Sequence, residues 1–141
     1  MTQMFLKKVC LTLALALSLA GCVSMQNVRG KPVPTAFFVF FEAGQSEPTA
    51  ESKAVFDEAA AYLKQYDNTS VRIVGHVSPD ETAPQLDQQR ASRVAEELVK
   101  RGALAARMDL LGVGSQESLS GGAKGGDPAM DRRVEVLFNT M

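Results

Sequence analysis

Residues 71–78 read VRIVGHVS, and this stretch decides the fold expected for the chain. Val71 and Ile73 alternate with the residues beside them, a pattern that predicts a β-strand. The segments before and after the stretch carry apolar residues at helical spacing instead. The strand is therefore expected to lie between two helices.

The remaining elements follow from the same two spacings. Thr49 is the predicted N-cap of the first helix, and Asp80 or Thr82 that of the second, which Gly102 ends. The aromatic run at residues 36–41 is typical of a strand covered on both faces. The expected elements are a strand at 36–41, a helix from about 50 to 66, a strand at 71–74, a helix from about 83 to 101, a strand at 108–113 and a strand at 133–138.

This β-α-β-α-β-β order predicts an α+β fold, a two-layer sandwich with a mixed sheet and the helices on one face. With 45% hydrophobic and 22% charged residues among 141, the composition fits one globular domain. We place that domain at residues 36–141, after a linker at 22–35. Residues 118–128 contain four glycines and predict a flexible surface loop.

Residues 1–21 have the composition of a secretion signal, with two lysines, an apolar run and small residues before Cys22. The apolar run is too short to span a membrane as a helix. Its ending, LAGC, resembles the lipobox of bacterial lipoproteins, which implies acylation of Cys22; the alternative is a plain secretory signal. Cys10 is discarded with the signal, so the mature chain forms no internal disulfide. Val23, where Asp favours inner-membrane retention, indicates the outer membrane.

Charge argues against a nucleic-acid partner. Removing Lys7 and Lys8 with the signal lowers the 15 basic residues to 13 against 16 acidic ones, a net charge of −3. Nucleic-acid binding needs a clustered basic face. We expect the lipid anchor, and not charge, to hold the protein at a membrane.

Several short fragments together resemble the OmpA-like C-terminal domain family, which includes OmpA, the peptidoglycan-associated lipoprotein and MotB. Their order and spacing carry the resemblance, from about Phe38 to Phe138. It implies a domain that binds peptidoglycan without cutting it, by holding the diaminopimelate of the stem peptide. The fragments are FFE at 40–42, AYLK at 61–64, VRIVGH at 71–76, RA at 90–91, GVG at 112–114 and RRVE at 132–135.

The resemblance also implies a ligand site. Arg90 matches the arginine that takes the ligand carboxylate, and a guanidinium can do so with two parallel bonds. The acid that meets the ligand ammonium is expected at position 78, where this chain has Ser78. We therefore expect Ser78 to be assisted by Asp80 or Glu81.

Two further residues complete the predicted site. Glu42 matches an acid near the pocket at the end of the first strand, or else is a solvated strand end. Arg132 is a candidate ligand contact, or else forms with Arg133 and Asp131 a surface ion pair of small worth.

Enzyme and cofactor functions are not expected. His76, Ser78 and Asp80 share one loop, but residues two apart on a strand cannot form a converging triad. A lone histidine without cysteines cannot build a zinc site, and the glycines at 121–126 lack the Lys-Ser or Lys-Thr of a phosphate loop. No cofactor is therefore predicted.

The sequence thus predicts an outer-membrane lipoprotein whose periplasmic domain binds peptidoglycan and tethers membrane to wall. The alternative is a domain that kept the fold, lost the ligand and now binds other envelope proteins. A peptidoglycan hydrolase comes third.

Overall fold

The structure is a computed structural model that describes residues 36–66, 68–119 and 127–139. These residues belong to one compact unit, residues 33–141. The predicted signal, the predicted acylation site Cys22 and the predicted linker lie outside the described residues, as does most of the predicted loop at 118–128. Among the described residues, no helix has both the length and the apolar character needed to cross a membrane.

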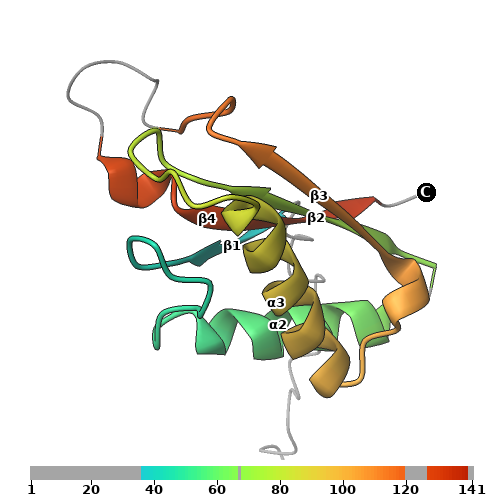
Figure 1. Ribbon diagram of the computed structural model, residues 1–141. Helices are drawn as coiled ribbons and strands as arrows, with labels where there is room; N and C mark the ends of the chain where they lie inside the picture. Colours follow the sequence, from blue (N-terminus) through green and yellow to red (C-terminus); the bar gives the residue numbers. More distant parts are fainter. Residues whose placement is uncertain (1–35, 67, 120–126, 140–141) are drawn as a thin grey trace, which may run out of the picture. The chain divides into compact units, whose positions relative to one another are not determined.

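The chain alternates strands and helices in the predicted order, so the α+β architecture is confirmed (Figure 1). The elements are β1 (Ala36–Phe40), α2 (Lys53–Gln65), β2 (Ser70–His76), α3 (Leu86–Lys100), the short 3-10 turn η1 (Ala105–Arg107), β3 (Met108–Gly114), the second 3-10 turn η2 (Pro128–Met130) and β4 (Arg133–Asn139).

The four strands form one mixed sheet in the order β1-β4-β2-β3. The β2–β3 pair, joined through α3, is parallel, whereas β4 is antiparallel to both β1 and β2. Figure 1 shows α2 and α3 on the same face of the sheet, which confirms the two-layer prediction. The last strand therefore lies inside the sheet, between the first two.

The core lies between the sheet and the two helices. Val71 and Ile73 are 1% and 0% exposed, as their alternation predicts, and they face apolar residues at helical spacing on α2 and α3. The inward residues of the other strands and the helices complete the core, including Phe37, Val39, Phe56, Leu63, Val94, Leu98, Val134 and Val136.

Two local predictions at the start of the domain are wrong. The first strand is not covered on both faces, because it is an edge strand and the helices cover only one side; Phe38 is 41% exposed. Thr49 does not cap α2, which begins at Lys53 after Ser52. The Thr49 hydroxyl lies 3.1 Å from the Ser52 hydroxyl, which also accepts the Phe40 N–H at 3.2 Å. These polar groups tie the helix entrance to β1.

The start of α3 also differs from the prediction. The helix begins at Leu86, after Gln85 in the left-handed region at φ 58°, and neither Asp80 nor Thr82 caps it. The reason is a tertiary contact. Residues 78–81 form a turn, in which the Glu81 N–H donates to the Ser78 carbonyl at 3.0 Å, and the Glu81 side chain contacts Arg90 on α3. The predicted end is confirmed: Gly102 has φ +92° and its N–H donates to the Val99 carbonyl at 2.8 Å, as a C-terminal glycine does.

The N-terminal turn of α3 packs unusually close to the sheet. A Cβ on Gly75 would lie 1.9 Å from the Asp87 carbonyl oxygen, and one on Gly112 would lie 2.6 Å from the Asp87 carboxylate. That carboxylate accepts the Gly114 N–H at 2.9 Å. Two glycines and one aspartate therefore fix the helix start over the ends of β2 and β3, where the candidate site lies.

Candidate ligand site at the end of strand β2

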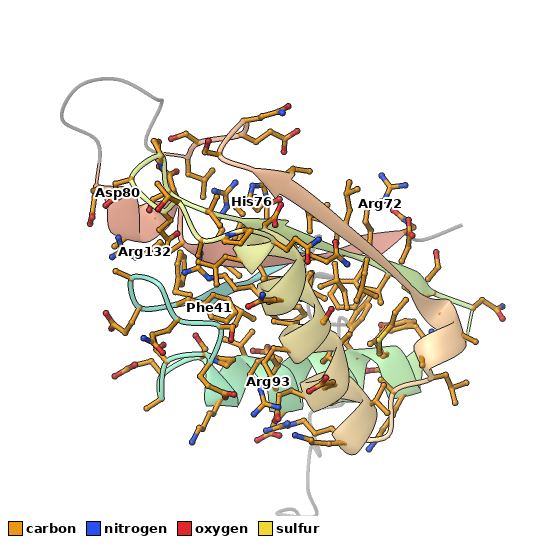
Figure 2. The ribbon with its side chains drawn as sticks, viewed as in Figure 1. Phe41, Arg72, His76, Asp80, Arg93 and Arg132 are labelled. Carbon is orange, nitrogen blue, oxygen red and sulfur yellow. The ribbon has the colours of Figure 1, made fainter. Side chains whose placement is uncertain are left out.

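The site forms where three segments meet, namely the end of β2 with its following loop, the second turn of α3, and the loop after β1. The first supplies residues 76–81, the second Arg90, and the third residues 42–45. Figure 2 shows His76, Asp80 and Arg132 toward this end of the domain, with Arg72 toward the other. Residues distant in sequence are thereby brought together.

Arg90 is the centre of the site. Its side chain is 0% exposed and its guanidinium carbon lies 5.1 Å from the centre of the Phe41 ring. An arginine has five N–H donors, and Arg90 donates five hydrogen bonds. Three go to backbone carbonyls and two to one carboxylate: Nε to Gln45 O (2.9 Å), Nη1 to His76 O (3.1 Å) and Glu81 Oε2 (2.8 Å), Nη2 to Glu42 O (3.2 Å) and Glu81 Oε1 (2.6 Å).

Glu81 is held as firmly as its partner. Besides the two bonds from Arg90, its carboxylate accepts the Gly44 N–H at 2.8 Å and the Ser78 N–H at 3.0 Å. The side chain is 6% exposed. Burial alone raises the pKa of Glu81, but the hydrogen bonds from Arg90, Gly44 and Ser78 outweigh burial and lower that pKa to about 2. Glu81 is therefore ionised at every physiological pH.

Ser78 and Asp80, the other predicted residues of this loop, differ in exposure. Ser78 is 0% exposed, and its hydroxyl has no hydrogen-bond partner within the described part of the chain. Asp80 is exposed on the same turn. Of the acids that follow Ser78, only Glu81 contacts Arg90, while Asp80 is the one that faces solvent.

Glu42 and Arg132 lie at the edge of the site. Glu42 contacts Arg90 through its backbone carbonyl, and its side chain is exposed. Arg132 is half-buried and donates from Nε to the Phe41 carbonyl at 3.3 Å. Glu42 and Arg132 both line a hollow of about 240 Å³ beside β1, whose lining residues do not include Arg90. The predicted site is thus divided between a buried centre and an open edge.

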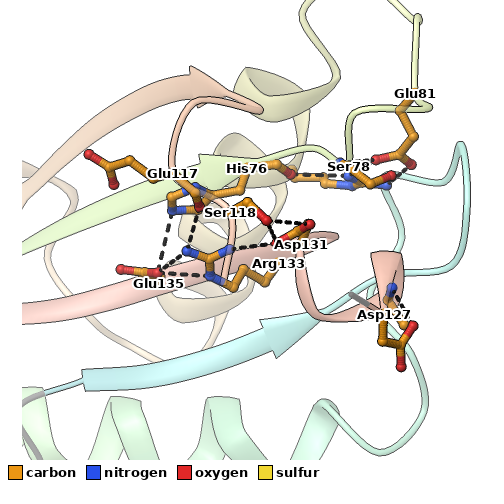
Figure 3. A network of polar contacts seen from close by, with 11 residues as sticks. His76, Ser78, Glu81, Glu117, Ser118, Asp127, Asp131, Arg133 and Glu135 are labelled. Atoms are coloured by element: carbon orange, nitrogen blue, oxygen red, sulfur yellow. Dashed lines mark hydrogen bonds and ion pairs between the residues drawn. The ribbon is translucent and has the colours of Figure 1, made fainter. Parts of the chain in front are cut away.

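A second polar cluster lies beside the site (Figure 3), and it corrects the expected surface ion pair. Arg133 is 2% exposed and donates to Glu135 Oε1 from Nε at 2.8 Å and from Nη2 at 2.6 Å. Asp131 is 1% exposed and accepts from the Ser118 hydroxyl. Arg133 Nη2 also donates to the Glu117 carbonyl at 3.1 Å, and Nη1 lies 3.8 Å from Asp131. The predicted pairing with Asp131 is thus buried, and Glu135 and Asp131 together compensate the charge of Arg133.

His76 has a structural position. Its ring is 1% exposed, and Nε2 lies 3.5 Å from Glu135 Oε1. Burial, reinforced by the nearby Arg133, lowers the pKa of His76, so the imidazole is neutral at pH 7. Neither the His76 ring nor the Ser78 hydroxyl has a hydrogen-bond partner among the described residues, so no nucleophile and base are paired there.

Sequence reasoning missed three parts of this site. It did not identify the Gly44 N–H or the Gln45 carbonyl as parts of the site, because every residue has these backbone groups and the sequence does not show which of them form contacts. It predicted Arg90 and Glu81 separately, as binding the two ends of a ligand, whereas the structure pairs them with each other. The acidic residue three positions after Ser78 was the available signal.

Together, the fold and the site define an α+β domain with a buried, arginine-centred loop cluster at the end of β2. The chain belongs to the OmpA family, whose model matches residues 40–132. The family resemblance of the sequence is thereby confirmed, and with it membership in a class of structural and binding domains.

Curated relatives agree with this assignment. Outer membrane porin F of Pseudomonas fluorescens is 32% identical over 101 residues, covering 70% of this chain and 31% of the porin. The peptidoglycan-associated lipoprotein of Rhizobium meliloti is 25% identical over 134 residues, covering 79% of this chain and 76% of that protein. The chain therefore spans about a third of the porin but most of the lipoprotein.

Solved structures show the same fold. The peptidoglycan-associated lipoprotein of Burkholderia pseudomallei has a TM-score of 0.67 at 23% identity, covering 72% of this chain and 89% of that one. The cell wall anchor of the type VI secretion system (T6SS) from Pseudomonas aeruginosa has a TM-score of 0.62 at 22% identity, covering 74% and 81%.

Proposed function

We propose that this chain is a lipid-anchored protein of the outer membrane whose OmpA-like domain, in the periplasm, binds peptidoglycan non-covalently and tethers the membrane to the wall. Membership in the OmpA family supports the proposal. Relatives that are peptidoglycan-associated lipoproteins support it further. We propose no enzymatic activity.

The ligand we propose is the zwitterionic end of diaminopimelate in the stem peptide. The observation that carries this proposal is the guanidinium of Arg90, fixed by three backbone carbonyls with two parallel N–H groups directed at a carboxylate. A fixed guanidinium is suited to bidentate recognition of a carboxylate. Since Glu81 occupies those N–H groups, the ligand carboxylate must exchange with it.

The ammonium of the ligand needs an anion that is not already paired. Within the described residues, Asp80 and Glu42 border the site with exposed side chains, whereas the Glu81 carboxylate already accepts four hydrogen bonds. We therefore assign the ammonium contact to Asp80, with the Ser78 hydroxyl as a neutral acceptor and Glu42 and Arg132 at the rim.

Sedimentation with purified sacculi tests this function. We expect the full-length protein in mild detergent to pellet with sacculi, and free diaminopimelate to release it. Asp80→Asn should weaken binding roughly tenfold, because a charge-assisted bond is replaced by a neutral one. Asp109→Asn is the matched control, an exposed acid at the start of β3, paired with Arg72.

Two results would contradict the proposal. Equal pelleting of both variants, insensitive to diaminopimelate, would show that the wall contact does not use this site. No pelleting at all would favour the second candidate function. Release of muropeptides would instead indicate a hydrolase.

The second candidate is an assembly module that binds other envelope proteins and no longer binds peptidoglycan. One observation favours it, because all five donors of Arg90 are satisfied from within the chain. This alternative predicts that the immobilised parent protein binds no sacculi. It also predicts that the parent and the Asp80→Asn variant retain the same envelope proteins.

The lipid anchor is tested separately. Cells fed labelled palmitate should label the parent protein and fractionate it with the outer membrane, because a chain that becomes N-terminal at Cys22 with several acyl groups is durably anchored. Cys22→Ser should lose the label and be released in soluble form. Label that persists in Cys22→Ser would refute acylation at this residue.

A further inference from the structure

The environment of the Glu81 carboxylate is that of a bound ligand. Two parallel N–H groups of Arg90 and the backbone N–H groups of Gly44 and Ser78 converge on its two oxygens, at 2.6–3.0 Å. We call these groups, Arg90 with the Gly44 and Ser78 N–H, the carboxylate cradle. They come from three segments of the chain, and the Glu81 carboxylate belongs to the same loop as Ser78, three residues further on.

We propose that Glu81 is an intramolecular stand-in for the ligand carboxylate, so that the carboxylate cradle of this chain is occupied by its own side chain. The inference rests on the proposed function in one respect, the place at Arg90 where the ligand carboxylate binds. It makes Glu81 the residue that sets the affinity of the site for carboxylates.

The guanidinium of the cradle stays fixed when Glu81 leaves. Arg90 Nε and one N–H from each terminal nitrogen are held by the carbonyls of Gln45, His76 and Glu42. These bonds fix the guanidinium plane independently of Glu81. The two remaining N–H groups therefore stay parallel and directed at the same point, as a receptor for any carboxylate of similar size.

Glu81 lies on a loop, whereas Arg90 lies on a helix. The loop joins β2 to α3, and within it the Glu81 N–H donates to Ser78 O at 3.0 Å. Displacement therefore requires movement of a loop and leaves the sheet and helices unchanged. A free ligand has to compete with a tethered carboxylate whose effective concentration is of the order of millimolar or higher. Its apparent association constant is therefore the intrinsic constant multiplied by the fraction of time that the cradle is open.

Acetate is the probe that tests this inference, because it is a carboxylate with no other recognisable group. In Glu81→Ala the cradle is vacant, and 200 mM sodium acetate should raise the Tm of the full-length protein by roughly 5–10 °C over sodium chloride at the same ionic strength. The parent should show no difference between the two salts. A two-dimensional NMR spectrum should show the Arg90 Nε–H signal shifting with acetate in the variant alone.

Glu97→Ala is the matched control. Glu97, on α3, is likewise a carboxylate paired with cations, Lys100 and Arg101, and its pKa is also lowered to about 2, chiefly by hydrogen bonds from those two residues. Its pairs lie on the surface of the helix, with no converging backbone N–H groups among the described contacts. Acetate should leave its Tm unchanged.

Glu81→Gln covers the case in which Glu81→Ala does not fold in chloride. Its amide keeps the size of the side chain but presents an NH₂ group to Arg90, so acetate should displace it and raise Tm in the same direction. Refolding of Glu81→Ala by acetate would also support the inference. If neither variant responds to acetate more than Glu97→Ala does, Glu81 is a structural ion pair and the inference is wrong. No peptidoglycan enters this experiment, so it can fail while wall binding stands.

Discussion

Gly75→Ala is expected to destabilise the domain by at least about 3 kcal/mol, enough to leave much of the protein unfolded or aggregated. The added Cβ would lie 1.9 Å from the carbonyl oxygen and 2.7 Å from the carbonyl carbon of Asp87. Both are backbone atoms of α3, so the clash is relieved only by moving the helix. Overpacking commonly costs 1–3 kcal/mol where side chains can adjust, and here they cannot.

The measurement is thermal and urea unfolding of the purified full-length protein. For a domain of this size, 3 kcal/mol corresponds to a fall in Tm of roughly 12–24 °C. Gly114→Ala is the control, because nothing lies within 4 Å of its Cβ and its φ of +64° costs only about 1–2 kcal/mol. If both variants lose a similar amount of stability, the close approach of Asp87 on α3 to Gly75 on β2 is contradicted.

Arg90→Ala is expected to cost about 3–5 kcal/mol, the usual cost of removing one partner of a buried ion pair. The substitution leaves the Glu81 carboxylate buried without its cation and three carbonyls without their donor. Arg93→Ala, three residues along the same helix, should cost less than about 1 kcal/mol, because Arg93 pairs with the exposed acids Glu47 and Glu96.

Acid unfolding distinguishes loss of the Arg90–Glu81 pair from loss of packing alone. The folded-state pKa of Glu81, about 2, lies below its ordinary value of 4.5. Its contribution to stability is therefore fully present above about pH 4.5 and is lost as the pH falls toward 2. At about 1.4 kcal/mol per pKa unit, the shift corresponds to roughly 3 kcal/mol.

The difference in unfolding free energy between parent and Arg90→Ala should accordingly narrow by roughly 3 kcal/mol across that pH range, whereas the difference between parent and Arg93→Ala, below about 1 kcal/mol at the start, can change by no more than that. His76 is present in all three proteins, so its own titration cancels. A difference that stays constant from pH 5 to pH 2.5 would mean that Arg90 stabilises the fold without the charge of Glu81.

Local sequence patterns predicted most of the fold. Alternation at Val71 and Ile73 and helical spacing on α2 and α3 reproduce the observed elements, because each pattern reflects which face of one segment is buried. The two wrong predictions of where α2 and α3 begin have one cause. Ser52 bonds to β1 and Glu81 to Arg90, and such long-range partners decide where a helix begins more than the nearest capping residue does.

The candidate site was predicted as a set of residues but not as an arrangement. Arg90, Ser78 and Glu81 meet at the end of β2, but Glu81 pairs with Arg90 and does not stand apart from it as the predicted ammonium contact. Their exposure was not predictable, since a sequence does not say that Arg90 is 0% exposed with every donor used. Arg133, which the sequence placed in a surface ion pair, is likewise buried, because residues 117 and 131 contact its side chain from outside the strand.

The sequence by itself determined the α+β class, the order of the elements and membership in the OmpA family. Only the tertiary structure decided that the Glu81 carboxylate, three residues after Ser78, fills the place opposite Arg90. The physical reason is that hydrophobic periodicity is written along each segment, whereas a buried ion pair depends on where three separate segments bring one guanidinium and two backbone N–H groups together.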